Sequence, residues 1–337
     1  MYLPFYNHPM ILIAGSANLD FVVRAPRIPA PGETVLGSSF TTFTGGKGAN
    51  QAVACARAGG VDTRMLLALG SDSFAEPIEA SLNAAGVLLH LVRPDDLPTG
   101  TAFICVSDDA ENAITVAPGA NLALRAEHLP ELGGVTYLLM QLETPLATVH
   151  AYAAAARSSD VQVVLNAAPA QALPLALLAL VNVLVVNRGE LAYISDCTGS
   201  VADCLKCLPD VSCIVVTLGA LGCCARVGDR FVMQPAFAVT AVDTTAAGDT
   251  FCGVLVASLS LQLTLAQALE RASAAAALAC AKHGAQASIP TRTEVDVFLA
   301  SQSADTSTRA DATAAIARLA QFIGLDFQIP TSSTDNA

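Results

Sequence analysis

Short apolar runs separated by helix-like stretches dominate the chain. The run Met10–Ala14 ends at Gly15 and has the length of a buried first strand. From about residue 130, similar runs alternate regularly with helical segments. The predicted strands are Val135–Met140, Val161–Leu165, Val181–Val186 and Cys213–Leu218, and the predicted helices between them are Leu146–Arg157, Pro174–Leu180 and Val201–Leu208. This alternation predicts an α/β fold with a doubly wound, mostly parallel sheet covered on both faces.

More polar strand-like segments interrupt the first half of the chain. Phe21–Val23 and Thr34–Phe43 follow the first strand, and Thr101–Ser107 and Asn112–Val116 flank a turn-rich connection. Mixed polarity of this kind is typical of a small sheet with one exposed face. We therefore expect a β-sheet lid built from segments of about 20–44 and 100–117.

The last third of the chain predicts buried helices and then a tail. Thr250–Leu261 and Leu265–Lys282 are apolar almost all round, as in helices enclosed by other elements. Residues 1–300 are expected to form one domain that includes the lid. Residues 301–337 form a Ser/Thr/Asp-rich tail, partly helical or disordered, with its helical patch at Ala312–Ile323.

Composition excludes several classes of protein. The 337 residues are 53% hydrophobic and 14% charged, which excludes a disordered chain. The longest nearly unbroken apolar run, Ala172–Val181, is far shorter than the roughly 20 residues of a membrane span. Seventeen basic and 29 acidic residues give a net charge of −12 without a basic cluster, so neither nucleic acid nor a membrane is an expected partner. The N-terminus lacks the features of a secretory signal, and we expect a cytoplasmic protein.

Ten cysteines are scattered through apolar sequence, where reduced thiols behave as small hydrophobic side chains. Cys204 and Cys207 have the spacing of half a zinc site, with Cys213 and the pair Cys223–Cys224 beyond. No second such pair and no paired histidines complete the pattern. Buried thiols are the favoured interpretation, with a zinc site as the alternative.

The polar residues after the first strand argue against a dinucleotide-binding enzyme. A Rossmann phosphate loop has the spacing G-x-G-x-x-G at this position. Here the sequence is Gly15-Ser-Ala-Asn-Leu-Asp20, which places polar side chains where those glycines are required. A dehydrogenase is therefore not expected.

A glycine-rich motif, Thr44-Gly-Gly-Lys-Gly-Ala-Asn-Gln51, opens the predicted helical stretch Ala49–Ala58. Glycines before a helix allow a ligand to approach the backbone, and the free amides of the helix N-terminus attract anions. The spacing is not that of a Walker A loop. The alternative is a tight turn that carries a solvated Lys47.

A second motif spans 241–251, Ala-Val-Asp-Thr-Thr-Ala-Ala-Gly-Asp-Thr-Phe. We expect a strand to end at Val242 and a helix to start near Gly248. The small residues Ala246, Ala247 and Gly248 leave the helix amides open to a phosphoryl group. Asp249, in the first turn, could cap the helix or accept a proton from a substrate hydroxyl. With an anion cradle beside it, the second role describes phosphoryl transfer.

The two motifs, in this order and this far apart, resemble the signatures of the ribokinase/PfkB family of carbohydrate kinases. The likeness covers about residues 10–300, including Pro29–Val35, Met140–Pro145, Leu165–Ala170 and Gly284–Pro290. It implies a ribokinase-like core with a lid, and transfer of phosphate from ATP to a sugar with Mg²⁺ and a monovalent cation, K⁺. The likeness is greatest to members that convert D-ribose to D-ribose 5-phosphate, and it implies a homodimer paired through the lid.

The resemblance also implies the roles of individual residues. Asp249 would be the base, with the amides of Ala246, Ala247 and Gly248 as the anion hole. The implied sugar site is Asn18, Asp20, Gly46, Lys47, Gly48, Asn50, Glu143 and Asp249; the implied ATP site is Asn187, Thr217, Gly219, Gly222, Gly248 and Ser273. Asn187 and Glu190 would hold Mg²⁺ through water, and the monovalent cation would lie among Asp243, Thr245, Ala279, Lys282, Gly284 and Ser288, several of them through backbone carbonyls.

Each of these residues also has a plainer interpretation. Asn18 could cap a turn, Asp20 could be a solvated acid, and Glu190 could be an ordinary acid at a helix start. Gly219 and Gly222 could form a simple strand turn, and Lys282 could be a favourable partner of a helix C-terminus. Ser273 departs from the polar or ring side chains that many relatives carry beside adenine, which leaves the nucleotide preference open. Thr245 and Ala287 also depart from commoner residues of the family, which a cation coordinated by carbonyls would tolerate. The rival functions are a related kinase of deoxyribose, a hexose or a nucleoside, and a non-catalytic sugar-binding regulator.

Overall fold

A nine-stranded sheet forms the centre of the protein. The computed structural model describes residues 9–109, 111–304 and 308–325. The strands lie in the order β13-β12-β11-β10-β9-β8-β1-β4-β5. Their bounds are β1 (Met10–Ala14), β4 (Asp62–Ala68), β5 (Leu88–Val92), β8 (Val135–Met140), β9 (Gln162–Asn166), β10 (Val183–Asn187), β11 (Cys213–Thr217), β12 (Gly222–Val227) and β13 (Arg230–Pro235). All neighbours from β5 to β11 pair in parallel, while β12 and β13 add an antiparallel hairpin at one edge.

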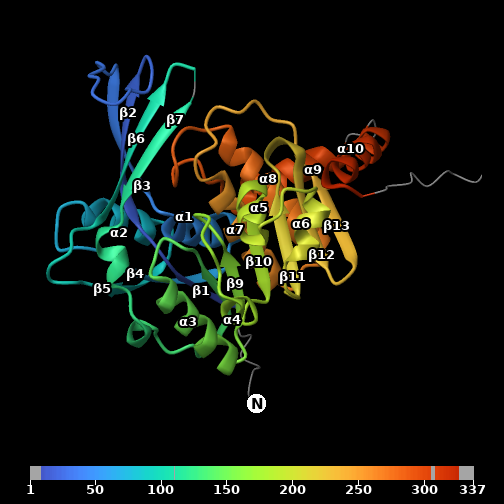
Figure 1. The fold of residues 1–337 in the computed structure, drawn as a ribbon, viewed down its shortest axis with the longest axis horizontal. Helices are drawn as coiled ribbons and strands as arrows, with labels where there is room; N and C mark the ends of the chain where they lie inside the picture. The colour runs from blue at the N-terminus through green and yellow to red at the C-terminus, as the bar shows by residue number, and fades with distance from the viewer. Residues whose placement is uncertain (1–8, 110, 305–307, 326–337) are drawn as a thin grey trace, which may run out of the picture.

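Helices cover both faces of this sheet (Figure 1). One face packs against α1 (Lys47–Val53), the π-helical turn η1 (Ala54–Gly59), α2 (Ala75–Ala84), α7 (Ala247–Ser260), α8 (Leu265–Cys280) and α9 (Arg292–Ala304). The other packs against α3 (Leu146–Ser158), α4 (Leu175–Leu178), α5 (Arg188–Ser195), α6 (Val201–Cys207) and α10 (Thr308–Ile323). In β1, Ile11 and Ile13 belong to the first core, whereas Leu12 and Ala14 belong to the second. The strand is apolar throughout because both of its faces are buried.

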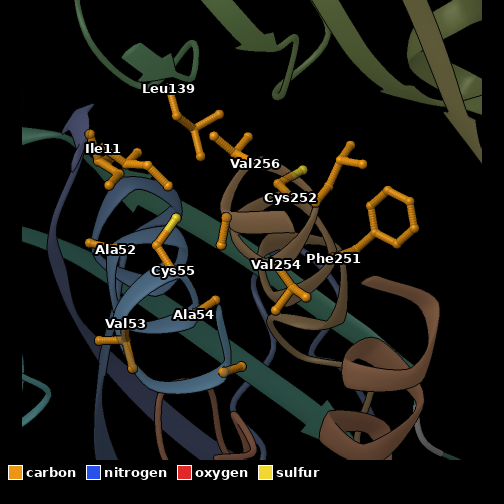
Figure 2. Close-up of a cluster of buried hydrophobic side chains, with 14 of the residues drawn as sticks. Ile11, Ala52, Val53, Ala54, Cys55, Leu139, Phe251, Cys252, Val254 and Val256 are labelled. Atoms are coloured by element: carbon orange, nitrogen blue, oxygen red, sulfur yellow. The ribbon is translucent and has the colours of Figure 1, made fainter. Parts of the chain in front are cut away.

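Close packing joins the two helices that carry the sequence motifs. Figure 2 shows residues of α1 and η1 facing Phe251, Cys252, Val254 and Val256 of α7. A Cβ atom on Gly253 would lie 2.6 Å from the Cβ of Ala54, and one on Gly59 would lie 2.3 Å from the Cβ of Ala257. Glycine at these contacts lets the helix backbones approach. The first turns of α1 and α7 are thereby held side by side.

The lid is a separate four-stranded sheet in the order β3-β2-β6-β7. It consists of β2 (Asn18–Ala25), β3 (Ser39–Gly45), β6 (Gly100–Ser107) and β7 (Asn112–Ala117), and it projects from the core at the upper left of Figure 1. Large apolar side chains on it are exposed, among them Phe40 (60%), Phe103 (55%) and Ile114 (56%). Its base, at Asn18 and Gly45, lies directly above the end of β1.

The structure confirms the predicted α/β core and the small sheet, and it corrects several boundaries. The strand predicted to end at Val242 is wrong: residues 236–242 are irregular, and Val242 is 49% exposed. The strand predicted from Thr34 begins only at Ser39. The helical stretch 49–58 starts earlier, at Lys47, and ends as the π-helical turn η1. Among the residues that the structure describes, no helix is long and apolar enough to cross a membrane.

The segment beyond residue 300 is helical where the structure describes it. Helix α9 continues to Ala304, past the expected domain end, and the helix predicted over 312–323 is α10. Leu319 and Ile323 of α10 are buried in the second core. The guanidinium of Arg188 in α5 lies over the ring of Phe322, 5.1 Å from its centroid. The described part of this segment is thus packed against the core.

Candidate active site

The residues of both motifs meet at the carboxyl ends of the parallel strands. In open α/β sheets this edge is where ligands bind. Two adjoining cavities of about 460 Å³ and 240 Å³ open there. Both are lined by Thr217, Thr244 and Gly248, so they form one continuous depression. Asp249 lines the smaller cavity.

Asp249 is held by the neighbouring helix and does not cap its own helix. The carboxylate is 9% exposed, and its Oδ2 accepts a hydrogen bond from Asn50 Nδ2 at 2.9 Å. Its Oδ1 accepts a second one from Gln51 Nε2 at 3.0 Å. Helix α7 has no side-chain cap bond at its N-terminus. A buried carboxylate placed in this way can accept a proton from a hydroxyl beside it.

The start of α7 leaves backbone amides free to face the cavity. Ala246 adopts the left-handed conformation (φ 59°), which turns the chain into the helix, and its carbonyl accepts the first helical bond, from Thr250 N at 2.8 Å. Amides of a first helical turn have no intrahelical acceptor and carry the positive end of the dipole. A Cβ atom on Gly248 would meet nothing within 4 Å. The glycine therefore leaves open space in front of the amides, as an anion site requires.

Polar side chains at the base of the lid lie close to Asp249. Asn18 and Asp20 begin β2, and both are buried. Two features of the Gly45–Gly46 turn allow this. A Cβ atom on Gly45 would lie 2.1 Å from Asp20 Oδ2, and Gly46 has a φ of +87°. The glycines are thus required both by close approach and by backbone conformation.

Two residues not expected from the sequence orient this polar group. Asn121 Nδ2 donates to Asn18 Oδ1 at 2.8 Å and so fixes the Asn18 amide. Ser16 Oγ donates to Glu143 Oε2, which also accepts from Lys47 N at 3.2 Å. Asn121 lies in a 3-10 turn more than 100 residues from Asn18, so no local spacing could have indicated the contact.

Electrostatics at the site depend on four carboxylates and one ammonium group. Burial, followed by the charges of Glu143 and Asp249, raises the pKa of Asp20 to about 7. Burial alone would lower the pKa of Lys47, but the nearby carboxylates of Asp249, Glu143 and Glu190 outweigh it and raise the pKa. Lys47 therefore stays charged among the acids. Such a cation is suited to a transferring phosphoryl group.

The sugar end contains an acceptor without a protein partner. Asn50 Oδ1 is buried and has no hydrogen-bond partner among the described residues, although Asn50 Nδ2 binds Asp249. A buried acceptor left unpaired costs about 1–3 kcal/mol. A ligand hydroxyl would satisfy this oxygen within reach of the Asp249 carboxylate. The geometry therefore fits a polyhydroxylated substrate.

The larger cavity is lined mainly by small and apolar side chains. Phe251, Ala276 and Ala277 form part of its wall, and the backbone turn at Gly219 and Gly222 forms another part. Ser273 also lines it, but its hydroxyl lies 3.7 Å from Cys223 Sγ. The residues that the sequence assigned to ATP thus lie together around one cavity, with Asn187 in the adjoining one.

Asn187 and Glu190 form a capping box at the start of α5. Glu190 N donates to Asn187 Oδ1 at 2.8 Å, and Asn187 N donates to Glu190 Oε2 at 2.7 Å. Both residues also line the smaller cavity opposite Asp249. Burial raises the pKa of Glu190, against the lowering effect of the Asn187 amide and of Lys47. Carboxylate and amide oxygens at this place fit a hydrated Mg²⁺.

The residues expected around a monovalent cation are brought together only in part. Asp243 accepts hydrogen bonds from Thr245 N and Gly284 N, each at 2.9 Å. The backbone amides of Val242 and Asp243 both donate to the Cys280 carbonyl. Ser288 is buried and donates to the Ala285 carbonyl. The Lys282 ammonium points elsewhere, to Glu294 at 2.7 Å, so only its backbone could take part. The Asp243 carboxylate and the Cys280 carbonyl thus belong to one hydrogen-bonded group, and oxygen groups of this kind can bind a monovalent cation.

Known carbohydrate kinases resemble this chain in sequence and in fold. A family model described as pfkB family carbohydrate kinase matches residues 8–292. The ribokinase of Haemophilus influenzae is 38% identical over 303 residues, covering 86% of this chain and 98% of that protein. The crystal structure of Thermotoga maritima ribokinase has a TM-score of 0.79 at 33% identity, covering 87% of this chain and 99% of the other. A structure of Arabidopsis thaliana ribokinase complexed with ribose and ATP has a TM-score of 0.79 at 30% identity, with the same coverage.

The fold and the sequence are those of a carbohydrate kinase. The chain belongs to the pfkB family, and the expectation drawn from its two motifs is confirmed. The enzyme is accordingly a phosphotransferase that acts on a sugar hydroxyl.

Proposed function

We propose that the protein transfers the terminal phosphoryl group of ATP to the 5-hydroxyl of D-ribose, giving ADP and D-ribose 5-phosphate. The ribose would lie against Asn18, Asp20 and Glu143 below the lid, and ATP would occupy the larger cavity. Asp249 accepts the hydroxyl proton as the oxygen attacks phosphorus and the bond to the ADP oxygen breaks. The amides at the start of α7 and the Lys47 ammonium stabilise the charge on the moving group.

The observation that carries this proposal is the position of Asp249. Its carboxylate lines the smaller cavity beside Gly248, and one of its oxygens is bonded to Asn50, whose own amide oxygen has no partner among the described residues. This geometry supports a role of Asp249 as proton acceptor, between Asn50, which would bind a hydroxyl, and the start of α7, which would bind the phosphoryl group. A helix cap or a solvated acid would not need this arrangement.

The test is an ADP-release screen over pentoses, hexoses and nucleosides with the purified chain and ATP. A site that hydrogen-bonds a hydroxyl discriminates against the analogue that lacks it by about 1–3 kcal/mol. We therefore expect kcat/KM to favour ribose over 2-deoxyribose by roughly ten- to a hundredfold. Equal use of deoxyribose, or preference for a nucleoside or hexose, would contradict the assignment of D-ribose as the substrate. Absence of ADP release with every sugar would instead favour the rival function, a non-catalytic sugar-binding regulator.

Two ions belong to this proposal. Glu190 and Asn187 would hold Mg²⁺ through water, and the ion would neutralise phosphate charge. K⁺ beside Asp243 would order the loop that leads into α7. We expect K⁺ to raise kcat at constant Mg²⁺, and equal rates in K⁺ and in tetramethylammonium at matched ionic strength would contradict the second site.

We further propose a homodimer that pairs through the lid, in the cytoplasm, where reducing conditions keep thiols such as the buried Cys55 and Cys252 unoxidised. The lid exposes Phe40, Phe103 and Ile114, and exposed apolar groups of this size mark interaction surfaces. Light scattering of the wild type and of Phe103→Glu would test it, because the charge should produce a monomer. A wild-type monomer would contradict the proposal.

A further inference from the structure

Three buried side-chain amides form a hydrogen-bonded chain behind Asp249. Gln141 follows β8, Gln51 lies in α1, and Asn166 ends β9. Gln141 Nε2 donates to Gln51 Oε1 at 2.6 Å, and Gln51 Nε2 donates both to Asp249 Oδ1 and to Asn166 Oδ1 at 3.0 Å. Gln51 and Gln141 are 0% exposed. None of the roles proposed above uses these amides.

The carboxylate at the end of the chain determines its direction. An ionised carboxylate only accepts hydrogen bonds, so Gln51 must present its nitrogen to Asp249. Rotation of the Gln51 amide by half a turn would bring Oε1 against the acceptor oxygens of both Asp249 and Asn166. Its Oε1 therefore faces Gln141, which has to donate. Each amide fixes the orientation of the next.

This arrangement has a cost in stability. Gln141 Oε1 is buried without a partner among the described residues. It occupies the space beside Gly15, where a Cβ atom would lie only 1.8 Å away. An unpaired buried acceptor is unfavourable. The donor nitrogen of Gln141 is the only polar atom of that side chain that forms a bond in the described structure.

We propose that Gln51, oriented by Gln141, is a positioning residue that sets the rotation of the Asp249 carboxylate. The bond to Oδ1 leaves Oδ2, the oxygen bonded to Asn50 at the sugar end, directed toward the substrate hydroxyl. This inference rests on the proposed role of Asp249 as the base. Misplacement of a reacting group by about 1 Å can lower a rate by roughly a hundredfold.

The test compares kcat, the KM for ribose and the Tm of Gln51→Met and Gln141→Met. Methionine has a similar length but cannot donate. We expect Gln51→Met to lower kcat by about 10- to 100-fold, and Gln141→Met by about 3- to 10-fold, with the KM for ribose within about twofold of wild type. Gln141→Met should change the Tm little, because it removes the unpaired Gln141 Oε1 but leaves the buried Gln51 Oε1 without its donor. This variant therefore remains informative even if Gln51→Met folds poorly.

Two further variants separate positioning from structure. Asn182, whose Oδ1 accepts a bond from Val163 N at the opposite end of the sheet, is the matched control. Asn182→Ala should lower the Tm and leave kcat unchanged. Because Gln141 acts through Gln51, the double variant should be no slower than Gln51→Met alone. Wild-type kcat in folded Gln51→Met, or a loss confined to KM, would overturn the inference. A fully active Asp249→Asn would instead overturn the proposed function.

Discussion

The two ends of the site are built in opposite ways. At the sugar end, Asn18, Asp20 and Asn50 are polar and buried, and Asn18 and Asn50 are bonded to side chains from other elements. The nucleotide end is a larger cavity whose wall is mostly alanine, glycine and apolar carbon. One end would recognise its ligand by directed hydrogen bonds and the other mainly by shape and backbone. Substitutions should therefore have much larger effects at the polar end and at the junction than in the larger cavity.

The largest effect is expected at the junction. Asp249→Asn keeps the size of the side chain and removes the proton acceptor, so kcat should fall by about 10²–10⁴-fold. Ribose binding should change little, because Asn50 can still bond to the amide oxygen, and the Tm should fall, because the new amide nitrogen faces the donor Gln51 Nε2. Steady-state kinetics and ribose calorimetry on the same preparation provide the measurement. Near-normal turnover in the folded variant would exclude Asp249 as the base.

A smaller effect is expected where the cavities meet. Gly248→Ala adds a methyl group that touches no protein atom and projects into the open space in front of the α7 amides. Alanine also favours the helix by about 0.5–1 kcal/mol. We expect a Tm at least equal to that of wild type, with kcat/KM for ATP lowered by about 10- to 100-fold. Unchanged ATP kinetics would show that the phosphoryl group does not approach these amides.

At the sugar end, Asp20 should make the protein less stable at high pH. Its pKa is raised from 3.8 to about 7 by burial and by neighbouring acids. Between these values the folded state keeps the proton and the unfolded state loses it, so the free energy of unfolding falls as pH rises toward 7. Asp20→Asn removes this penalty. Calorimetry at pH 8 should show a Tm raised by about 2 °C or more, a gain that shrinks toward pH 5. A lower Tm at pH 8 would contradict the burial argument.

The smallest effect is expected in the larger cavity. The Ser273 hydroxyl lies beside Cys223 within the protein. Ser273→Ala should therefore change the KM for ATP by less than about threefold, which ATP titrations at saturating ribose would measure. A tenfold change in the KM for ATP would contradict the contrast between the two ends, because it would mean that the nucleotide end also makes a directed polar contact.

The same contrast explains what the sequence could reveal. Apolar runs predicted β1 and β8 to the residue, since strands buried on both faces leave a continuous signal. The two glycine-containing motifs predicted an anion cradle with Asp249 beside it, and the family resemblance added Asn18, Asp20 and Glu143; the structure brings these residues close together. Ser273 and Gly219 were assigned through the family resemblance, because a cavity lined by small residues has little sequence signature.

Two kinds of feature escaped prediction for physical reasons. The apolar residues 236–242 suggested a strand, but Phe237 and Val239 line the larger cavity and pair with no neighbouring strand. Asn121, Gln141 and Asn166 act through contacts with residues far away in the chain. In the sequence, only the positions of Gln141 and Asn166 pointed to the site, because both are polar residues at the carboxyl ends of apolar strands. That signal could have identified them as part of the site edge.

The shape of the lid has a mechanical consequence. Strand β2 carries Asn18 and Asp20 at its base and extends to Ala25, about 23 Å farther along at a rise of about 3.3 Å per residue. If the lid turned by about 10° about this base, its tip would travel about 4 Å while Asp20 would move only about 1 Å. A rotation about the base of the lid therefore displaces its outer end the most and the residues at its base the least. Such a rotation would open the lid to a sugar while the side chains proposed to bind it stay almost in place.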